Sequence, residues 1–290
     1  MLPDFELYEA KSIEEACRLK RDLKARILAG GTDVIVAMHS GALRPAALID
    51  IKRIKALQGI RDTGDALVFG ALTSHREIEE DPLYEKTYTA LYEGCSQVGS
   101  VQIRFRGTLG GNICNAVPSA DSIGPLLVFD AKCVVASDTA ERTVELSEFF
   151  TGPKRTVLQD NEILKEIVVP KPKPGTGSCY IKYTRRKAMD LALCGCSILV
   201  SLDSEERIVT ARVALTTSAP TPIRAPHAEE YLTGKKAGEV DIAELRRLTV
   251  SDAKPRSSWR SSAELRLTLI EELAEQAFQK ALARAKGEQS

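Results

Sequence analysis

The sequence has 290 residues, of which 43% are hydrophobic and 28% are charged, the composition of an ordinary soluble globular protein with room for one or two cores. Lys plus Arg and Asp plus Glu both number 40, so there is no excess of positive charge to hold nucleic acid or an anionic membrane surface. The N-terminus lacks the positive flank and apolar run of a signal peptide, and no segment is apolar for the length of a membrane span, which favours a cytoplasmic location.

The first 51 residues alternate between helical and strand patterns. Ser12-Ile13-Glu14-Glu15 is a capping-box pattern followed by apolar residues at helical spacing, which predicts an amphipathic helix over 12–24. A short apolar strand at 27–29 runs directly into Gly30-Gly31-Thr32-Asp33. A helix over 34–39 and a buried strand over 48–51 are predicted to follow.

Residues 66–122 begin with regular elements and end in a glycine-rich loop. We predict a strand over 66–70, a short helix over 73–80 that stops before Pro82, and a longer helix over 83–98. Residues 107–122 are too rich in glycine for either element, so they predict a long structured loop.

A proline- and glycine-rich linker divides the chain. Strands are predicted at 132–137, 142–146 and 163–169, and then comes Pro170-Lys171-Pro172-Lys173-Pro174-Gly175-Thr176-Gly177. Strands at 178–186, 194–202 and 207–217 follow it, and then helices at 225–232, 240–252 and 261–286. We therefore expect an α+β protein with domains at 1–174 and 178–286, the second being smaller, with an antiparallel sheet and helices.

The first glycine-rich loop, Leu28-Ala29-Gly30-Gly31-Thr32-Asp33-Val34, ends a strand and opens toward a helix. Successive backbone N–H groups can converge on an anion at such a place, and glycine lets the backbone come close to a phosphate. Asp33 could accept a hydrogen bond from a ligand hydroxyl or simply cap the next helix. On its own the loop is a weak signal, because most Gly-Gly pairs after a strand are only turns.

The second loop, Thr108 to Ser122, combines bare backbone with two amides, two serines and a carboxylate. Two such loops some 75 residues apart could hold both ends of an extended dinucleotide. Neither loop has the Gly-x-Gly-x-x-Gly spacing of a Rossmann site or the Gly-Lys-Ser/Thr of a P-loop, so a different dinucleotide fold is required.

The pair Ala29-Gly30-Gly31-Thr32-Asp33 and Thr108-Leu109-Gly110-Gly111-Asn112-Ile113-Cys114-Asn115 resembles the FAD domain of the molybdenum hydroxylase flavoprotein subunits. That domain belongs to the wider fold of p-cresol methylhydroxylase and vanillyl-alcohol oxidase. The resemblance continues at 181–192, 221–224 and 255–260 and covers essentially the whole chain. It is strongest to the bacterial xanthine dehydrogenase FAD-binding subunits.

This resemblance implies noncovalent FAD and a set of residues that bind it. The first loop would hold the pyrophosphate and the second the ribityl, the adenosine and part of the flavin. Leu164 would pack on the isoalloxazine, Lys182 would lie near its oxygen edge, and Asp190 would influence its potential. The implied cofactor-binding residues are Arg26, Ile27, Leu28, Ala29, Gly30, Gly31, Thr32, Asp33, Val34, Ala71, Thr108, Gly110, Gly111, Asn112, Cys114, Asn115, Asp121, Leu164, Lys182 and Asp190.

Three of these residues have other interpretations from pattern alone. Leu164 fits a core strand position, Lys182 fits a solvent-facing strand position, and Asp121 could cap a helix that begins near Ser122. No catalytic residue and no metal site is predicted. The seven cysteines are odd in number and scattered, which favours reduced thiols, and Cys194 and Cys196 should share one face of a strand. His39, His75 and His227 are expected to be ordinary surface or cap residues.

The resemblance implies an electron-transfer role within a complex. A molybdenum cofactor on a large subunit would oxidise the substrate, and [2Fe–2S] centres on a small subunit would carry electrons to FAD on this chain, which would pass them to NAD or another acceptor. A dimer of heterotrimers is expected. The alternatives are a self-contained FAD oxidoreductase of the same wider fold and an adaptor that has lost FAD.

Overall fold

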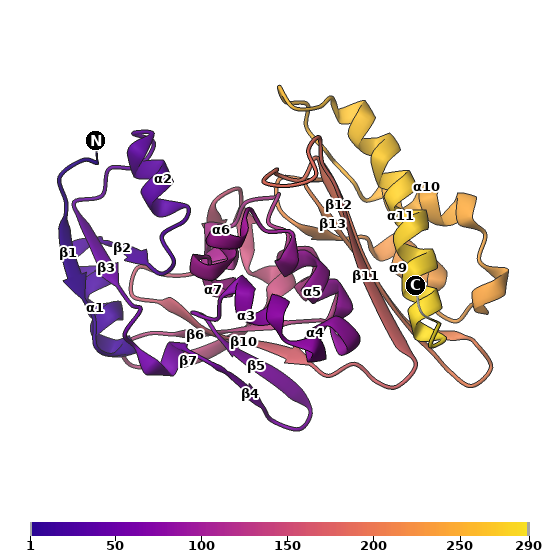
Figure 1. The fold of residues 1–290 in the computed structure, drawn as a ribbon, viewed down its shortest axis with the longest axis horizontal. Coiled ribbons are helices and arrows are strands. Elements are labelled where there is room, and N and C mark those ends of the chain that lie inside the picture. Colours follow the sequence, from indigo (N-terminus) through magenta and orange to yellow (C-terminus); the bar gives the residue numbers. More distant parts are fainter. Residues whose placement is uncertain (1, 289–290) are drawn as a thin grey trace.

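The computed structural model describes residues 2–288 and begins with a small parallel sheet (Figure 1). Strands β1 and β2 flank β3 and run parallel to it. The side chain of Ser12 accepts a hydrogen bond from the Glu15 N–H at 3.2 Å, so the predicted start of helix α1 is confirmed. The elements are β1 (Glu6–Glu9), α1 (Ile13–Leu23), β2 (Arg26–Leu28), α2 (Val34–His39) and β3 (Ala47–Asp50).

A five-stranded antiparallel sheet follows, in the order β4-β5-β10-β6-β7. Helices from the long segment between β5 and β6 pack against it and share its apolar core (Figure 1). The strands and short turns are η1 (Lys55–Leu57), β4 (Ile60–Asp62), β5 (Ala66–Gly70), β6 (Lys132–Ala136), β7 (Glu141–Glu145), η2 (Leu146–Glu148), β8 (Phe150–Gly152), β9 (Arg155–Thr156) and β10 (Ile163–Pro170). The helices are α3 (His75–Glu80), α4 (Pro82–Thr87), α5 (Thr89–Ser96), α6 (Val101–Arg106), α7 (Leu109–Asn115) and α8 (Ile123–Val128).

Two predictions for this segment were wrong. The single helix expected over 83–98 is interrupted at Tyr88, whose backbone (φ −119°, ψ 46°) is not helical. The ring of Tyr88 is buried and packs between Tyr84 and Phe129, so tertiary packing sets the break. The expected loop over 107–122 contains helix α7, which forms despite its two glycines.

The C-terminal part is a four-stranded antiparallel sheet with helices on both faces. Helix α11 lies across β11 and β12, while α5 and α8 pack from the other side (Figure 1). Every residue of β12 from Cys194 to Ser201 is therefore buried, and Cys194, Cys196 and Cys179 share one apolar cluster. The elements are β11 (Thr176–Tyr183), β12 (Cys194–Leu202), β13 (Ile208–Thr216), β14 (Ile223–Arg224), α9 (Pro226–Leu232), η3 (Ala237–Glu239), α10 (Ile242–Ser251) and α11 (Ala263–Ala285).

The α+β fold class is confirmed, with a mixed first part and a smaller antiparallel sheet after the linker. All seven cysteines are free thiols, as predicted. None of the helices within residues 2–288 is both long and apolar enough to cross a membrane.

Glycine lets α11 approach the C-terminal sheet, and this contact can be tested. A Cβ on Gly177 would stand 2.1 Å from the Ala281 carbonyl oxygen and 2.3 Å from the Ala285 nitrogen. Gly177→Ala should therefore lower the free energy of unfolding by about 1–3 kcal/mol, because backbone atoms must move. Gly238→Ala is the matched control, since nothing lies within 4 Å of its added Cβ. Equal urea midpoints for the two variants would contradict this account of the contact.

Candidate functional site

The first glycine loop presents a run of unused backbone donors. It leads from β2 into α2, with Gly31 in the left-handed region (φ 80°). None of the backbone N–H groups of Gly30, Gly31, Thr32 and Asp33 donates a hydrogen bond within the described chain. Successive free donors in a loop that leads into a helix suit an anion such as a phosphate.

The second glycine segment uses its donors internally. The N–H groups of Leu109 and Gly110 donate to the carbonyls of Thr73 and Ala71 at 2.8 and 3.0 Å, and the Thr108 hydroxyl caps α7 by accepting from the Gly111 N–H at 3.1 Å. A Cβ on Gly110 would stand 2.6 Å from the Ala71 carbonyl oxygen. These glycines therefore permit close packing, and the expectation of bare backbone throughout this segment was wrong.

Backbone contact joins the two segments. A Cβ on Gly30 would stand 1.8 Å from the Arg106 carbonyl oxygen and 3.2 Å from the Gly107 Cα, so only glycine fits there. Asp33 does not cap α2 with its side chain but pairs with Asn115 at the end of α7. Loss of solvation raises the pKa of Asp33, and the Asn115 hydrogen bond opposes this rise.

A buried ion pair lies where α8 meets the C-terminal sheet. The Lys182 ammonium donates to an Asp121 carboxylate oxygen at 2.8 Å and to the Gln97 carbonyl at 3.0 Å, and the Tyr180 hydroxyl donates to the other carboxylate oxygen at 2.8 Å. The side chains of Lys182 and Asp121 are 4% and 7% exposed. Burial raises the pKa of Asp121, and the Lys182 charge opposes that rise. Two interpretations were therefore wrong: Lys182 does not face solvent, and Ser122, not Asp121, is the N-cap of α8.

This ion pair is linked to the second glycine segment. Ser122, the residue after Asp121, donates from its hydroxyl to the Asn112 side-chain oxygen at 2.7 Å. Asn112 lies within α7, so the start of α8 and the glycine helix are held together. The structure thus brings together predicted site residues from positions 30 to 182.

The other predicted residues have distinct surroundings. Leu164 is buried in the apolar core on β10, next to Lys165, whose carbonyl accepts from the Ala71 N–H at 2.9 Å. Asp190 accepts from three N–H groups of its own β11–β12 loop and makes no hydrogen bond or ion pair with either glycine loop. Burial raises the pKa of Cys114 to about 12, which supports a packed thiol. Arg26, Ile27 and Leu28 form β2, and Val34 opens α2.

Sequence reasoning missed His75. It was expected at the surface or as a cap, yet the residue is 1% exposed and its Nδ1 is enclosed without a hydrogen-bond partner. Its backbone N–H donates to the Gly107 carbonyl at 3.2 Å, directly at the junction of the two segments. Only its place after the Ser74 cap of α3 was visible in the sequence, and that position does not reveal burial.

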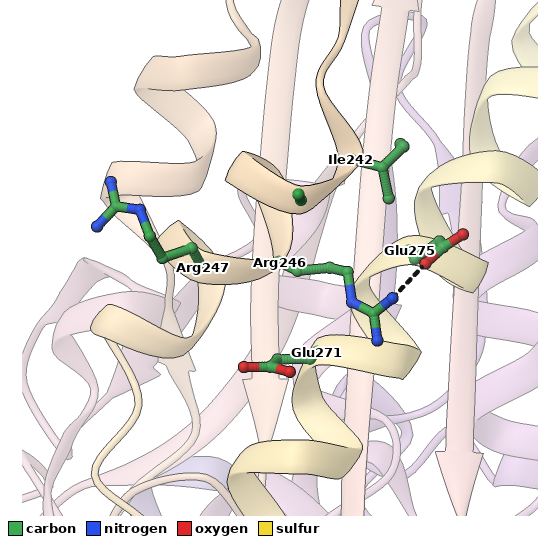
Figure 2. A pocket seen from close by; sticks show the side chains of 6 residues that line it. Ile242, Arg246, Arg247, Glu271 and Glu275 are labelled. Atoms are coloured by element: carbon green, nitrogen blue, oxygen red, sulfur yellow. Dashed lines mark hydrogen bonds and ion pairs between the residues drawn. The ribbon is translucent and has the colours of Figure 1, made fainter.

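A groove between α10 and α11 lies apart from this junction. Figure 2 shows its lining of Ile242, Arg246, Arg247, Glu271 and Glu275. Arg246 pairs with Glu275 at 2.9 Å and also with Glu272. The charged side chains of the groove are largely used in structural ion pairs, so we do not assign a ligand to the groove.

Two family models together match nearly the whole chain. The FAD-binding domain of molybdopterin dehydrogenase matches residues 3–172, and the CO dehydrogenase flavoprotein C-terminal domain matches residues 179–281. Residues of the glycine-loop junction lie in the first match, and Lys182 lies in the second.

Individual proteins agree with these matches. The xanthine dehydrogenase FAD-binding subunit of Escherichia coli O157:H7 is 36% identical over 288 residues, 98% of each chain. The carbon monoxide dehydrogenase medium chain of Hydrogenophaga pseudoflava is 32% identical over 284 residues, 97% of this chain and 98% of that one. A solved carbon monoxide dehydrogenase from Hydrogenophaga pseudoflava superposes with a TM-score of 0.94, at 32% identity over 98% of this chain and 99% of that chain. The predicted resemblance is confirmed: the chain belongs to the molybdopterin dehydrogenase FAD-binding family, whose members are oxidoreductase subunits.

Proposed function

We propose that this chain is the FAD-binding electron-transfer subunit of a xanthine dehydrogenase-like molybdenum hydroxylase complex. It takes electrons from [2Fe–2S] centres on a small subunit, which receives them from a molybdenum cofactor on a large subunit, and delivers them to NAD or another acceptor. The observation that carries this proposal is the run of four unused N–H donors at Gly30–Asp33, held by backbone contact against the second glycine segment.

The residues present fit an extended dinucleotide. The four donors suit a pyrophosphate, and glycine is needed for the shape of the loop, because Gly30 rests on the Arg106 carbonyl and Gly31 has a positive φ of 80°. We propose that the other predicted residues contact or influence the rest of FAD. These are the predicted residues of the second segment, together with Ala71, Leu164, Lys182 and Asp190 outside it. Several of their polar groups are already satisfied within the protein, so their role toward FAD is largely one of shape and charge.

Noncovalent FAD supplies the redox chemistry, since it exchanges electrons both singly and in pairs. The chain itself binds and orients it and sets the surrounding charge. Lys182 provides the buried positive charge, and its ammonium donates to Asp121 and to the Gln97 carbonyl, while Tyr180 donates to the Asp121 carboxylate. No side chain is required as a general acid or base.

The proposed partners are a molybdenum-binding large subunit and a [2Fe–2S] small subunit, in a dimer of heterotrimers. A surface beside the β11–β12 loop has the composition of a protein interface, with Met189, Leu191 and Trp259 exposed and Arg185 stacked on the Trp259 ring at 5.6 Å.

We propose a cytoplasmic location, which the seven free thiols support. We also propose two domains, 1–174 and 178–286, whose limits follow those of the two family matches.

Purification from the native host tests the proposed function. We expect noncovalent FAD, molybdenum and iron in a complex with two further subunits, identified by absorbance, metal analysis and mass spectrometry. Flavin on a lone chain that is reduced by its own substrate would instead establish a self-contained oxidoreductase. A folded, flavin-free chain in the same complex would establish an adaptor.

Gly30→Ala tests the junction of the two segments. Its methyl group would collide with the Arg106 carbonyl, so the first loop must move and FAD should bind about tenfold to a hundredfold more weakly. Fluorescence titration of the deflavinated protein with FAD measures this affinity. Gly152→Ala is the control, because its added Cβ meets nothing closer than 4.0 Å. Unchanged affinity for Gly30→Ala would contradict the proposed binding loop.

The buried ion pair should set the flavin potential. Lys182→Met removes a positive charge and should lower the midpoint potential, while Asp121→Asn removes a negative charge and should raise it, each by on the order of tens of mV. Both variants should lose stability, because each leaves a buried partner unpaired. Spectroscopic redox titration and thermal unfolding separate the two effects. Potential shifts of the same sign, or none, would leave the pair with a structural role alone.

A further inference from the structure

The imidazole of His75 lies at the junction of the two glycine segments. Its Cδ2 is 3.3 Å from the point where a Cβ on Gly107 would stand, and the Thr32 hydroxyl oxygen is 3.6 Å from the same point. The Ile103 carbonyl oxygen is nearer still, at 3.0 Å, so the absence of a side chain at Gly107 lets this edge of the ring pack closely against the segment. His75 and Thr32 of the first loop thus both lie beside Gly107.

The two ring nitrogens have different surroundings. Nδ1 is fully enclosed and has no hydrogen-bond partner. Nε2 makes no hydrogen bond within the described chain either, but it is not among the enclosed polar atoms. The Nδ1 edge is therefore enclosed by the protein, whereas Nε2 keeps some exposure to solvent.

This asymmetry determines the tautomer. Burial, together with the nearby Arg104 charge, lowers the pKa of His75 to about 4, so the ring is neutral at pH 7 and carries one proton. An enclosed N–H without an acceptor is rarer in proteins than an enclosed atom with an unused lone pair. The proton consequently resides on Nε2, which leaves a donor without an acceptor in the protein, on a ring that packs beside Gly107 and Thr32.

We infer that His75 is a further FAD-binding residue, whose Nε2–H donates a hydrogen bond to a pyrophosphate oxygen beside the donors of Gly30–Asp33. This rests on the proposed function, because the acceptor belongs to the dinucleotide. An anionic oxygen suits the position, since the surrounding groups on the first loop are the Thr32 hydroxyl and unused backbone N–H groups. The pyrophosphate oxygen would accept from the Nε2–H of His75, which has no acceptor within the protein.

Three substitutions of His75 test the inference in the full chain within its complex, after removal and titration of FAD. His75→Leu removes the donor and should weaken FAD and ADP binding about tenfold to a hundredfold. His75→Gln places an amide near the Nε2 position and should retain most of the affinity. His75→Asn places its amide near Nδ1 and should behave like the leucine variant. Equal affinity for wild type and His75→Leu would overturn the inference.

Nitrogen NMR of histidine-labelled protein provides a test that needs no variant. We expect the Nε2–H tautomer for His75 without ligand and a change in its Nε2–H resonance on adding ADP. An Nδ1–H tautomer, or an unchanged resonance with ADP bound, would overturn the inference. If the wild-type complex binds no FAD at all, the proposed function fails instead, which the same titration reveals.

Discussion

The contact of Gly30 with the backbone of Arg106 and Gly107 is the constraint on which the site depends. An added Cβ at Gly30 would overlap the Arg106 carbonyl, so no other residue permits this approach. Because the first loop rests on backbone and not on side chains, its position is set by the strands and helices on both sides. Its own N–H groups are thereby left unused and available to an anion.

A second group of interactions connects this junction to the C-terminal sheet. Asn112 of α7 accepts from Ser122, and the next residue back along the chain, Asp121, accepts from Lys182 and Tyr180 on β11. A buried charge pair is not by itself strong evidence for stability, since desolvation offsets much of the attraction. Its place at the boundary of two parts of the chain fits the proposed role of fixed charge near a redox cofactor.

The two glycine segments serve different purposes although they look alike in sequence. Both allow close backbone packing, at Gly30 and at Gly110, but the N–H groups stay free in the first, whereas those of Leu109 and Gly110 in the second donate within the protein. Sequence reasoning treated both as bare backbone for the ligand. The difference depends on which carbonyl groups lie nearby in space, and Thr73 and Ala71 come from another part of the fold.

The sequence by itself determined the family, the α+β class and most strands and helices, because hydrophobic periodicity, capping residues and two glycine motifs are local signals. It did not reveal that Tyr88 breaks a helix, that residues 109–115 are helical, that Lys182 is buried against Asp121, or that His75 is enclosed. Only the tertiary structure decided these points, because each depends on groups far away in the sequence. Burial and ion pairing depend on contacts between elements that are distant in sequence, and local sequence patterns do not predict those contacts.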